Sequence, residues 1–394
     1  MRLHPLEGRR IWFVGIGGAG LSGYALLARA WGAEVGGWDR VETPYLRQLE
    51  GVPIELAPEP VVPEAWGEVV VSTAYRGQVD GRSRADLLAE LVSLQRSIVV
   101  AGAHGKTTTA GMIAFCLDRL GDDPGFLVGG EIPQLGGNAR AGRGWLVVEG
   151  DESDRTIAAL RPEIAVVTNV DLDHHSEFAS YAEVESLFAD WLAAAPRSVR
   201  GDELEPVEFE LAIPGEHNRR NGAVALAAVA LAGYSAEEAG VALREYRGAA
   251  RRLEPRGEAG GVEIIDSYAH HPQELAADIA AVRDGGRTLV LFQPHLYSRT
   301  RHLAHAFGAS LASADVVAVT DVYRAREEPV EGVTGKLVVD AVADARPGME
   351  VGWTPAVEDG ARFVAARARA GDRVLTLGAG DVDRAVALIL EALA

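Results

Sequence analysis

The feature that most constrains this chain is a glycine-containing loop between a short apolar run and a helical pattern. Residues 97–101 (Ser-Ile-Val-Val-Ala) predict a buried strand, residues 102–105 (Gly-Ala-His-Gly) a loop, and residues 107–120 a helix that Gly121 ends. Such a loop directs backbone N–H groups and the positive end of the helix at one place, which favours a polyphosphate. Lys106 adds a charge for the terminal phosphates, and the Thr107 hydroxyl would reach a Mg²⁺ bound to them.

The phosphate-loop pattern G-x-x-x-x-G-K-[ST] is incomplete, because Val100 stands where its first glycine would be. For the shorter G-x-x-G-K-T alone, an ordinary glycine turn before a helix is an equally good interpretation. The chain contains only two lysines, Lys106 and Lys336, against 36 arginines. A chain that otherwise uses arginine has a lysine at the phosphate position, and this favours nucleotide binding.

Composition narrows the class of protein. The 394 residues suffice for two or three domains, and the net charge of −19 argues against a nucleic-acid partner. No apolar run reaches the roughly 18 residues that a membrane span needs, and the amino terminus contains no signal-peptide core. A lone Cys116 excludes an internal disulfide and fits a helix core position. These features predict a cytoplasmic enzyme that acts on small molecules.

A second glycine turn follows the first predicted strand. Residues 11–17 read as a buried strand that runs into Gly15-Ile-Gly-Gly-Ala-Gly20, and the next strand ends at Asp39. This is the G-x-G-x-x-G fingerprint with an acidic residue about 20 positions later. The pattern predicts a phosphate-bearing nucleotide but does not identify it. A third strand, residues 69–73, continues this domain to about residue 96.

Acidic and histidine residues follow two later strands. Residues 145–154 form an apolar run that ends in four carboxylates, of which Glu149 is the best Mg²⁺ ligand; a solvated loop or an N-cap is the alternative for the others, favoured for Asp154. Residues 164–169 form another strand, followed by Asp173 and His174. Because parallel strands end at one sheet edge, His174 is predicted to contact a metal or phosphate rather than to be a surface histidine.

The remaining chain predicts a linker and a further α/β domain. Residues 197–208 are polar and read as a linker or short hairpin. Asn218 and Asn221 open an alanine-rich helix, where they would face a base or ribose or, alternatively, cap the helix. From about residue 247, apolar strands alternate with helices, and polar residues follow each strand.

Eight ordered motifs closely resemble the Mur ligases, over nearly the whole chain. They are Gly15-Ile-Gly-Gly-Ala-Gly, Gly102-Ala-His-Gly-Lys-Thr-Thr-Thr, Glu149-Gly-Asp-Glu-Ser-Asp, Thr168-Asn with Asp173-His174, Pro214-Gly-Glu-His-Asn-Arg-Arg-Asn, Tyr268-Ala-His-His-Pro, Phe292-Gln-Pro-His and Gly378-Ala-Gly. The resemblance implies three α/β domains: a Rossmann-like domain for a UDP-sugar (1–96), a shortened ATP-binding domain with a P-loop ATPase-like parallel sheet (97–246) and a Rossmann-like ligase domain (247–394).

The resemblance further implies an ATP- and Mg²⁺-dependent ligase that joins L-alanine to UDP-N-acetylmuramate through an acyl phosphate, at the start of peptidoglycan stem-peptide synthesis. It would be a monomer or weak homodimer. The implied catalytic residues are Lys106, Glu149, His174, Arg252 and His270, and the implied metal ligands are Thr107, Glu149 and His174. ATP would contact Gly102, His104, Gly105, Lys106, Thr107, Thr108, Asn218 and Asn221. The substrate would contact Gly15, Gly17, Gly18, Gly20, Asp39 (near the uridine), Ser72, Asn138, Glu152, Ser153, His271 and Arg299.

Three departures from the family pattern leave room for different functions. Ser267 replaces the second aspartate of Asp-Asp-Tyr-Gly-His-His, Leu296 replaces an arginine, and the segment between Trp191 and Pro214 is short. A recycling ligase that adds a ready-made tripeptide to the same sugar nucleotide shares most motifs. The first glycine turn is also compatible with a nicotinamide dehydrogenase, and the departures are compatible with a nucleotide-binding scaffold that has no catalytic activity.

Overall fold

The computed structural model describes residues 4–151, 155–171, 178, 180–283, 286–325 and 327–394. The chain forms two compact units: unit 1 comprises Met1–Ala212 and Asn218–Ala249, and unit 2 comprises Ile213–His217 and Ala250–Ala394. Unit 1 contains two sheets and unit 2 one, each mainly parallel with helices between strands, so the α/β class is confirmed. The division of unit 1 at residue 96 and the boundary at residue 246 stay predictions.

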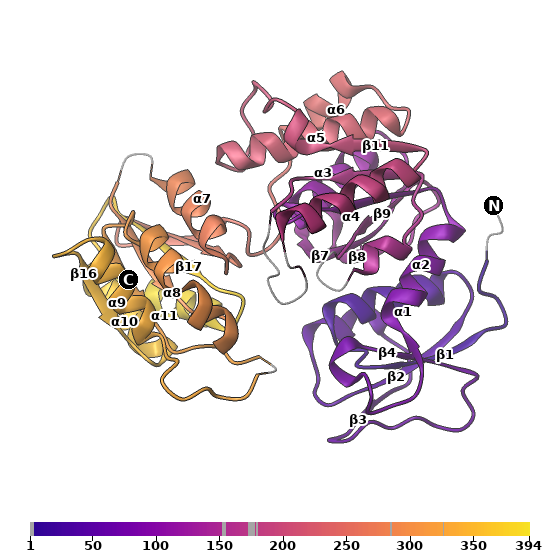
Figure 1. Ribbon diagram of the computed structural model, residues 1–394, viewed down its shortest axis with the longest axis horizontal. Coiled ribbons are helices and arrows are strands. Elements are labelled where there is room, and N and C mark those ends of the chain that lie inside the picture. Colours follow the sequence, from indigo (N-terminus) through magenta and orange to yellow (C-terminus); the bar gives the residue numbers. More distant parts are fainter. Residues whose placement is uncertain (1–3, 152–154, 172–177, 179, 284–285, 326) are drawn as a thin grey trace. The chain divides into compact units, whose positions relative to one another are not determined.

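The first sheet of unit 1 has the strand order β3-β2-β1-β4-β5, all parallel. Figure 1 labels β1, β2, β3 and β4 of this sheet. Its elements are β1 (Arg10–Val14), α1 (Ala19–Ala30), β2 (Glu34–Asp39), β3 (Ile54–Leu56), β4 (Glu68–Val71), β5 (Arg82–Ser83) and α2 (Arg84–Leu94). The strand order reverses at β1, which lies between β2 and β4. Ligands of open α/β sheets bind at the carboxyl ends of strands beside such a reversal, and the first glycine turn is found there.

The second sheet of unit 1 has the order β11-β10-β6-β9-β7-β8. Its elements are β6 (Ser97–Ala101), α3 (Lys106–Arg119), β7 (Gly125–Ile132), β8 (Gly137–Arg140), β9 (Leu146–Glu149), β10 (Ile164–Val167), α4 (Tyr181–Ala194), β11 (Arg197–Arg200), α5 (Glu216–Leu231) and α6 (Ala236–Leu243). β9 and β10 both pair with β6 in parallel, so the predicted meeting of their carboxyl ends at one edge is confirmed.

The prediction of a linker or hairpin at residues 197–208 is wrong for its first four residues. Arg197–Arg200 form β11, which pairs in parallel with β10. An edge strand buries little, and only Val199 of these four residues is buried, so the sequence lacks an apolar run. No strand follows among residues 204–215, all of which are described, before α5 begins.

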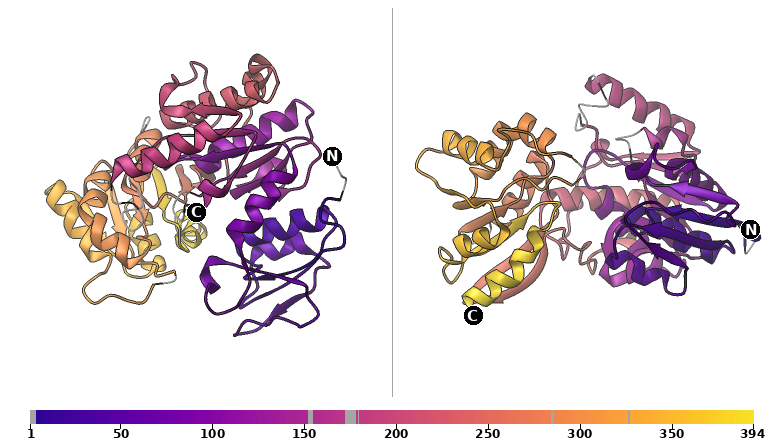
Figure 2. Two further views of the ribbon diagram at one scale, coloured as in Figure 1. Left: turned by 45° about the vertical axis from the view of Figure 1, so that its right-hand side comes forward. Right: turned by 90° about the horizontal axis from the view of Figure 1, so that it is seen from below.

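Unit 2 is a doubly wound sheet of order β12-β13-β17-β14-β15-β16, in which β12 alone is antiparallel to its neighbour. Its elements are β12 (Glu254–Ala259), β13 (Val262–Ser267), α7 (Pro272–Val282), β14 (Thr288–Phe292), α8 (Tyr297–Leu311), β15 (Val316–Val319), α9 (Lys336–Ala345), β16 (Glu350–Trp353), α10 (Val357–Ala365), β17 (Arg373–Leu377) and α11 (Ala385–Leu393). Two apolar clusters cover the sheet, one with α7, α8 and α9 and the other with α10 and α11, so helices lie on both faces (Figure 2).

Candidate functional site

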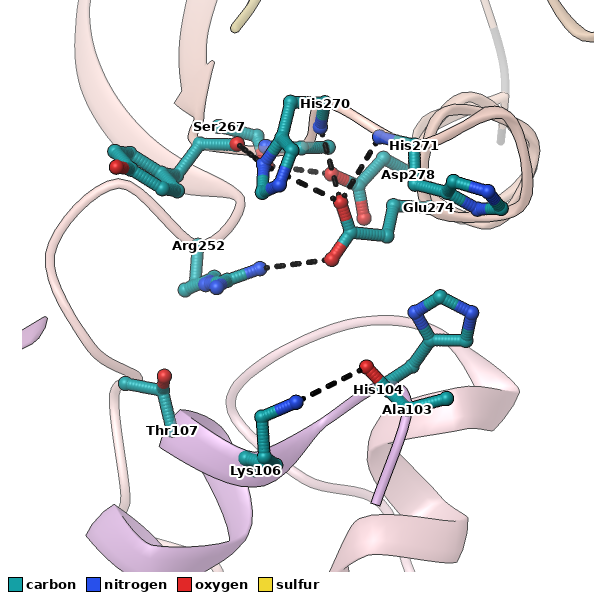
Figure 3. A network of polar contacts seen from close by, with 12 residues as sticks. Ala103, His104, Lys106, Thr107, Arg252, Ser267, His270, His271, Glu274 and Asp278 are labelled. Atoms are coloured by element: carbon teal, nitrogen blue, oxygen red, sulfur yellow. Dashed lines mark hydrogen bonds and ion pairs between the residues drawn. The ribbon is translucent and has the colours of Figure 1, made fainter. Parts of the chain in front are cut away.

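The phosphate loop lies between β6 and α3, as predicted. Gly105 is the N-cap of α3 with φ +79°, and Gly102 has φ +126°, both in the region that favours glycine. A Cβ at Gly102 would lie 2.2 Å from Thr168 Oγ1, so a side chain there would displace the loop. Lys106 Nζ donates to Gly102 O (2.6 Å) and Ala103 O (3.3 Å), which holds the ammonium over the loop (Figure 3).

Asn169 fixes this loop from the end of β10. His104 N–H donates to Asn169 Oδ1 (2.9 Å), and Asn169 Nδ2 donates to His104 O (2.8 Å). Thr168 Oγ1 donates to the same carbonyl at 2.6 Å. Sequence reasoning placed Thr168 and Asn169 in a family motif but did not name either as a site residue. Their position directly after a buried strand was the signal that could have identified them.

Thr107 and Glu149 form the oxygen pair that the sequence predicted as metal ligands. Thr107 Oγ1 donates to Glu149 Oε2 at 2.9 Å, and the N–H of Gly129 on β7 donates to the same oxygen at 2.7 Å. A hydroxyl and a carboxylate beside a phosphate loop are the ligands that Mg²⁺ uses in nucleotide sites. The predicted contributions of Glu152, Ser153 and His174 lie outside the described residues.

Gly129→Ala is expected to weaken Mg²⁺ binding without unfolding the protein. A Cβ at Gly129 would lie 2.7 Å from Glu149 Oε2, so the carboxylate must move. Its backbone is not in the left-handed region, so alanine fits the main chain. We expect the Mg²⁺ concentration for half-maximal activity to rise about tenfold. Gly67→Ala, where a Cβ meets nothing within 4 Å, is the matched control; an unchanged Mg²⁺ titration in Gly129→Ala would contradict this role of Glu149.

Asn218 and Asn221 lie beside the phosphate loop, both less than a tenth exposed. A Cβ at Gly105 would lie 2.4 Å from Asn221 Oδ1, and Asn221 Nδ2 donates to Asn218 Oδ1 at 3.4 Å. Because α5 begins at Glu216, Asn218 lies inside the helix and is not its N-cap. Thr108 is buried one residue after Thr107 in α3. The ATP-contacting residues of the sequence prediction that belong to the loop and to α5 therefore gather in one place.

The first glycine turn gathers most of the predicted sugar-nucleotide residues. Gly15 (φ +87°) packs on Ser72, because a Cβ there would lie 3.0 Å from Ser72 Cβ. Asn138 Nδ2 donates to Ala19 O at 2.9 Å from β8. Gly18 is the N-cap of α1, so Gly20 belongs to the helix.

Asp39 has an internal partner that the sequence did not predict. Its Oδ2 accepts the Gly17 N–H at 2.7 Å, and its Oδ1 accepts the Arg40 N–H at 2.7 Å. Only 8% of the residue is exposed. The carboxylate thus stabilises the glycine turn, and the predicted contact with the uridine remains a prediction.

The predicted residues of unit 2 gather around the loop between β13 and α7, and Arg299 reaches its surroundings from α8. Glu274 Oε2 accepts the N–H groups of His270 (3.0 Å) and His271 (3.1 Å), and Glu274 Oε1 lies 3.5 Å from Arg252 (Figure 3). Burial lowers the pKa of His270, Glu274 opposes this, and Arg299 and Arg252 lower it further. His217 also has a lowered pKa, caused first by burial and then by Arg252. Both rings therefore favour the neutral form, which can accept a proton.

Comparison with known proteins identifies the family. The model of the Mur ligase middle domain matches residues 100–197, and that of the Mur ligase glutamate ligase domain matches residues 251–380. UDP-N-acetylmuramate–L-alanine ligase of Streptomyces coelicolor is 38% identical and is aligned over 96% of each chain. The chain is a Mur ligase. Its middle-domain match contains the phosphate loop and Glu149, and its ligase-domain match contains Arg252, His270 and Arg299.

Solved structures give the same fold. UDP-N-acetylmuramate-alanine ligase of Thermotoga maritima aligns with this Mur ligase over 97% of this chain and 98% of its own, with a TM-score of 0.79 and 25% identity. A murein peptide ligase of Psychrobacter arcticus aligns over 98% and 99%, with a TM-score of 0.65 and 23% identity. The Streptomyces alignment spans 451 positions against 394 residues here, so this Mur ligase has deletions relative to that protein.

Proposed function

We propose that the chain is the ATP-dependent ligase that joins L-alanine to UDP-N-acetylmuramate in peptidoglycan synthesis. The observation that carries the proposal is the phosphate loop with its Thr107–Glu149 pair, in a chain that is similar over its full length to ligases of that name. A nicotinamide dehydrogenase is a poorer interpretation, because it would leave the phosphate loop and the Glu149 carboxylate without a function.

The chemistry explains why a lysine-bearing loop is needed. A carboxylate is a poor electrophile, so the sugar carboxylate first attacks the γ-phosphorus of ATP, the bond to ADP breaks, and an acyl phosphate forms. The amine of L-alanine then attacks the acyl carbon, loses a proton, and inorganic phosphate leaves. The first step joins two anions, and the Lys106 ammonium with the loop N–H groups lowers the cost of that approach in a protein of net charge −19.

Mg²⁺ is proposed as the accompanying ion, since the oxygens of Thr107 and Glu149 fit its preference. When bound, it would supply charge that polarises the terminal phosphates. The roles of Arg252, His270, His271 and Arg299 toward substrate stay predictions from the resemblance, as do the monomer or weak homodimer and the cytoplasmic location. Among the described helices, none is long and apolar enough to cross a bilayer.

Phosphate release by the purified protein tests the proposal. With UDP-N-acetylmuramate, ATP and Mg²⁺, we expect L-alanine to support turnover with a higher kcat/KM than L-serine, glycine or the tripeptide L-alanyl-γ-D-glutamyl-meso-diaminopimelate. Preference for the tripeptide would instead indicate a recycling ligase. No ATP-dependent product with any acceptor would indicate a nucleotide-binding scaffold.

A further inference from the structure

The loop between β13 and α7, residues 268–271, is fixed through every one of its backbone N–H groups. Tyr268 N–H donates to Arg251 O (2.6 Å), Ala269 N–H to Ser267 Oγ (3.3 Å), and the N–H groups of His270 and His271 to Glu274 Oε2. Four successive backbone donors of the loop therefore each have an acceptor. All of these acceptors lie outside residues 268–271, so the position of the loop depends on them. The His270 ring is held to the loop in turn, because its Nδ1 lies 3.0 Å from Tyr268 O.

Asp278 is a buried carboxyl that reaches this loop through Ser267. It lies one helical turn after Glu274, so α7 presents both carboxyls on one face. Ser267 Oγ donates to Asp278 Oδ2 at 2.5 Å (Figure 3) and accepts the Ala269 N–H. Both residues are buried, with 1% of Ser267 and 8% of Asp278 exposed. The proposed reaction itself does not use Asp278.

We propose that Asp278 and Ser267 are a positioning pair that holds the His270 loop for the ligase reaction. Asp278 provides, from helix α7, the carboxyl group that the related motif Asp-Asp-Tyr-Gly-His-His carries on the strand, where this chain has Ser267. The Ser267 hydroxyl connects this carboxyl group to the Ala269 N–H of the loop. The inference rests on the proposed function, since it concerns the loop of the same enzyme.

The pair keeps its hydrogen bond in either protonation state. Burial raises the pKa of Asp278 to about 7, Ser267 and Arg252 oppose the rise, and Glu274 adds to it. The ionised carboxylate accepts the serine proton, whereas the protonated carboxyl can donate to Ser267 Oγ, which has a second lone pair for Ala269 N–H. An asparagine can make the same contacts, so Asp278→Asn is a conservative variant and Asp278→Ala a disruptive one.

The test is an exchange of the two side chains. We expect Asp278→Ala to lower kcat for L-alanine-dependent phosphate release about 100-fold, with the KM for ATP changed less than about twofold, because the loop is misplaced while unit 1 is untouched. The kcat of Asp278→Asn should stay within about fivefold of the wild-type value. Ser267→Asp alone places two carboxyl groups together and should lower kcat as much as Asp278→Ala does. The double variant Ser267→Asp/Asp278→Ser should have a kcat at least about tenfold higher than that of either single variant.

A second measurement separates positioning from stability and from the proposed function. The ring signals of His270, assigned by NMR with His270→Gln, should shift in Asp278→Ala and return in the exchange variant. Asp372→Asn, a buried carboxyl before the amino end of β17, is the matched control and should leave both kcat and these signals unchanged. An exchange variant no better than the single changes, or an Asp278→Ala enzyme with wild-type kcat and His270 signals, would overturn the inference. A wild-type protein inactive with L-alanine would overturn the proposed function, and the NMR comparison would still decide the inference.

Discussion

Lys106→Ala is expected to lower ATP-dependent phosphate release by about 10³-fold or more, because no other lysine lies in unit 1. The Lys106 ammonium lies over the loop on Gly102 O and Ala103 O, where terminal phosphates would meet the helix α3 amino end. Without it, the approach of a carboxylate to the γ-phosphate is opposed by unscreened negative charge. The measurement is kcat with saturating UDP-N-acetylmuramate and L-alanine.

Two controls show whether this loss is chemical. The Lys106 side chain is not part of the core, so the midpoint of urea unfolding should move little. Binding of UDP-N-acetylmuramate by calorimetry should persist, since the first glycine turn is a separate feature of unit 1. Lys106→Arg keeps the charge but not the point-like ammonium, and we expect it to recover only part of the activity. Wild-type turnover by Lys106→Ala would remove the phosphate loop from the proposed mechanism.

The sequence predicted best where one strong local pattern fixes the structure. A buried apolar run followed by a glycine loop and a helix has few alternatives, so β6, the loop and α3 were predicted within a residue or two. The same holds for Glu149, because a polar residue at the end of a parallel strand must emerge at the sheet edge. Edge strands carry no such pattern, and β11 was missed for that reason.

Side-chain partners across the fold could not be predicted from the sequence. Asp39 has the position of a ribose-binding acid, yet its carboxylate accepts the Gly17 N–H; this pairing depends on how β2 ends beside the turn. The Gly129 N–H on β7 donates to Glu149 on the neighbouring strand β9. No local sequence pattern predicts that these two strands are neighbours. Asp278 likewise lies 11 residues beyond Ser267, and only the packing of α7 on the sheet brings them together.

The adjacent pair Arg251 and Arg252 shows the same limit. The two arginines are adjacent in the sequence, and the resemblance implied a role for Arg252 alone. In the structure, Arg251 makes contacts that stabilise the fold. Its Nε donates to Asp266 Oδ2 at 2.8 Å, and its two terminal nitrogens donate to Gly380 O (3.0 Å) and Gly378 O (2.7 Å). It therefore joins β13 to the glycine turn after β17.

Arg251→Ala is expected to destabilise unit 2 by about 3–5 kcal/mol, because it leaves the Asp266 carboxylate buried without its cation. Asp266 is fully buried, and Thr376 Oγ1 would be its remaining side-chain donor at 2.5 Å. Arg252→Ala is the matched control: its 3.5 Å contact with Glu274 is longer and partly exposed, so we expect a loss below about 1 kcal/mol. Urea unfolding of the wild type and both variants measures the difference.

The loss of stability in Arg251→Ala, measured as the free energy of unfolding, should grow as the pH rises. Burial already raises the pKa of Asp266, and Arg251 opposes the rise, so removing Arg251 raises the pKa further. Between the unfolded and folded pKa values the native state binds more protons than the unfolded state, and stability then falls with increasing pH. The loss of unfolding free energy in Arg251→Ala should be smaller at pH 5 than at pH 8. At pH 8 the buried Asp266 carboxyl must either be ionised or bind a proton, and both cost free energy. Arg251→Ala/Asp266→Asn should remove this pH dependence, because no buried charge remains; an equal defect at both pH values in the single variant would show that lost packing, not the stranded carboxylate, is the cause.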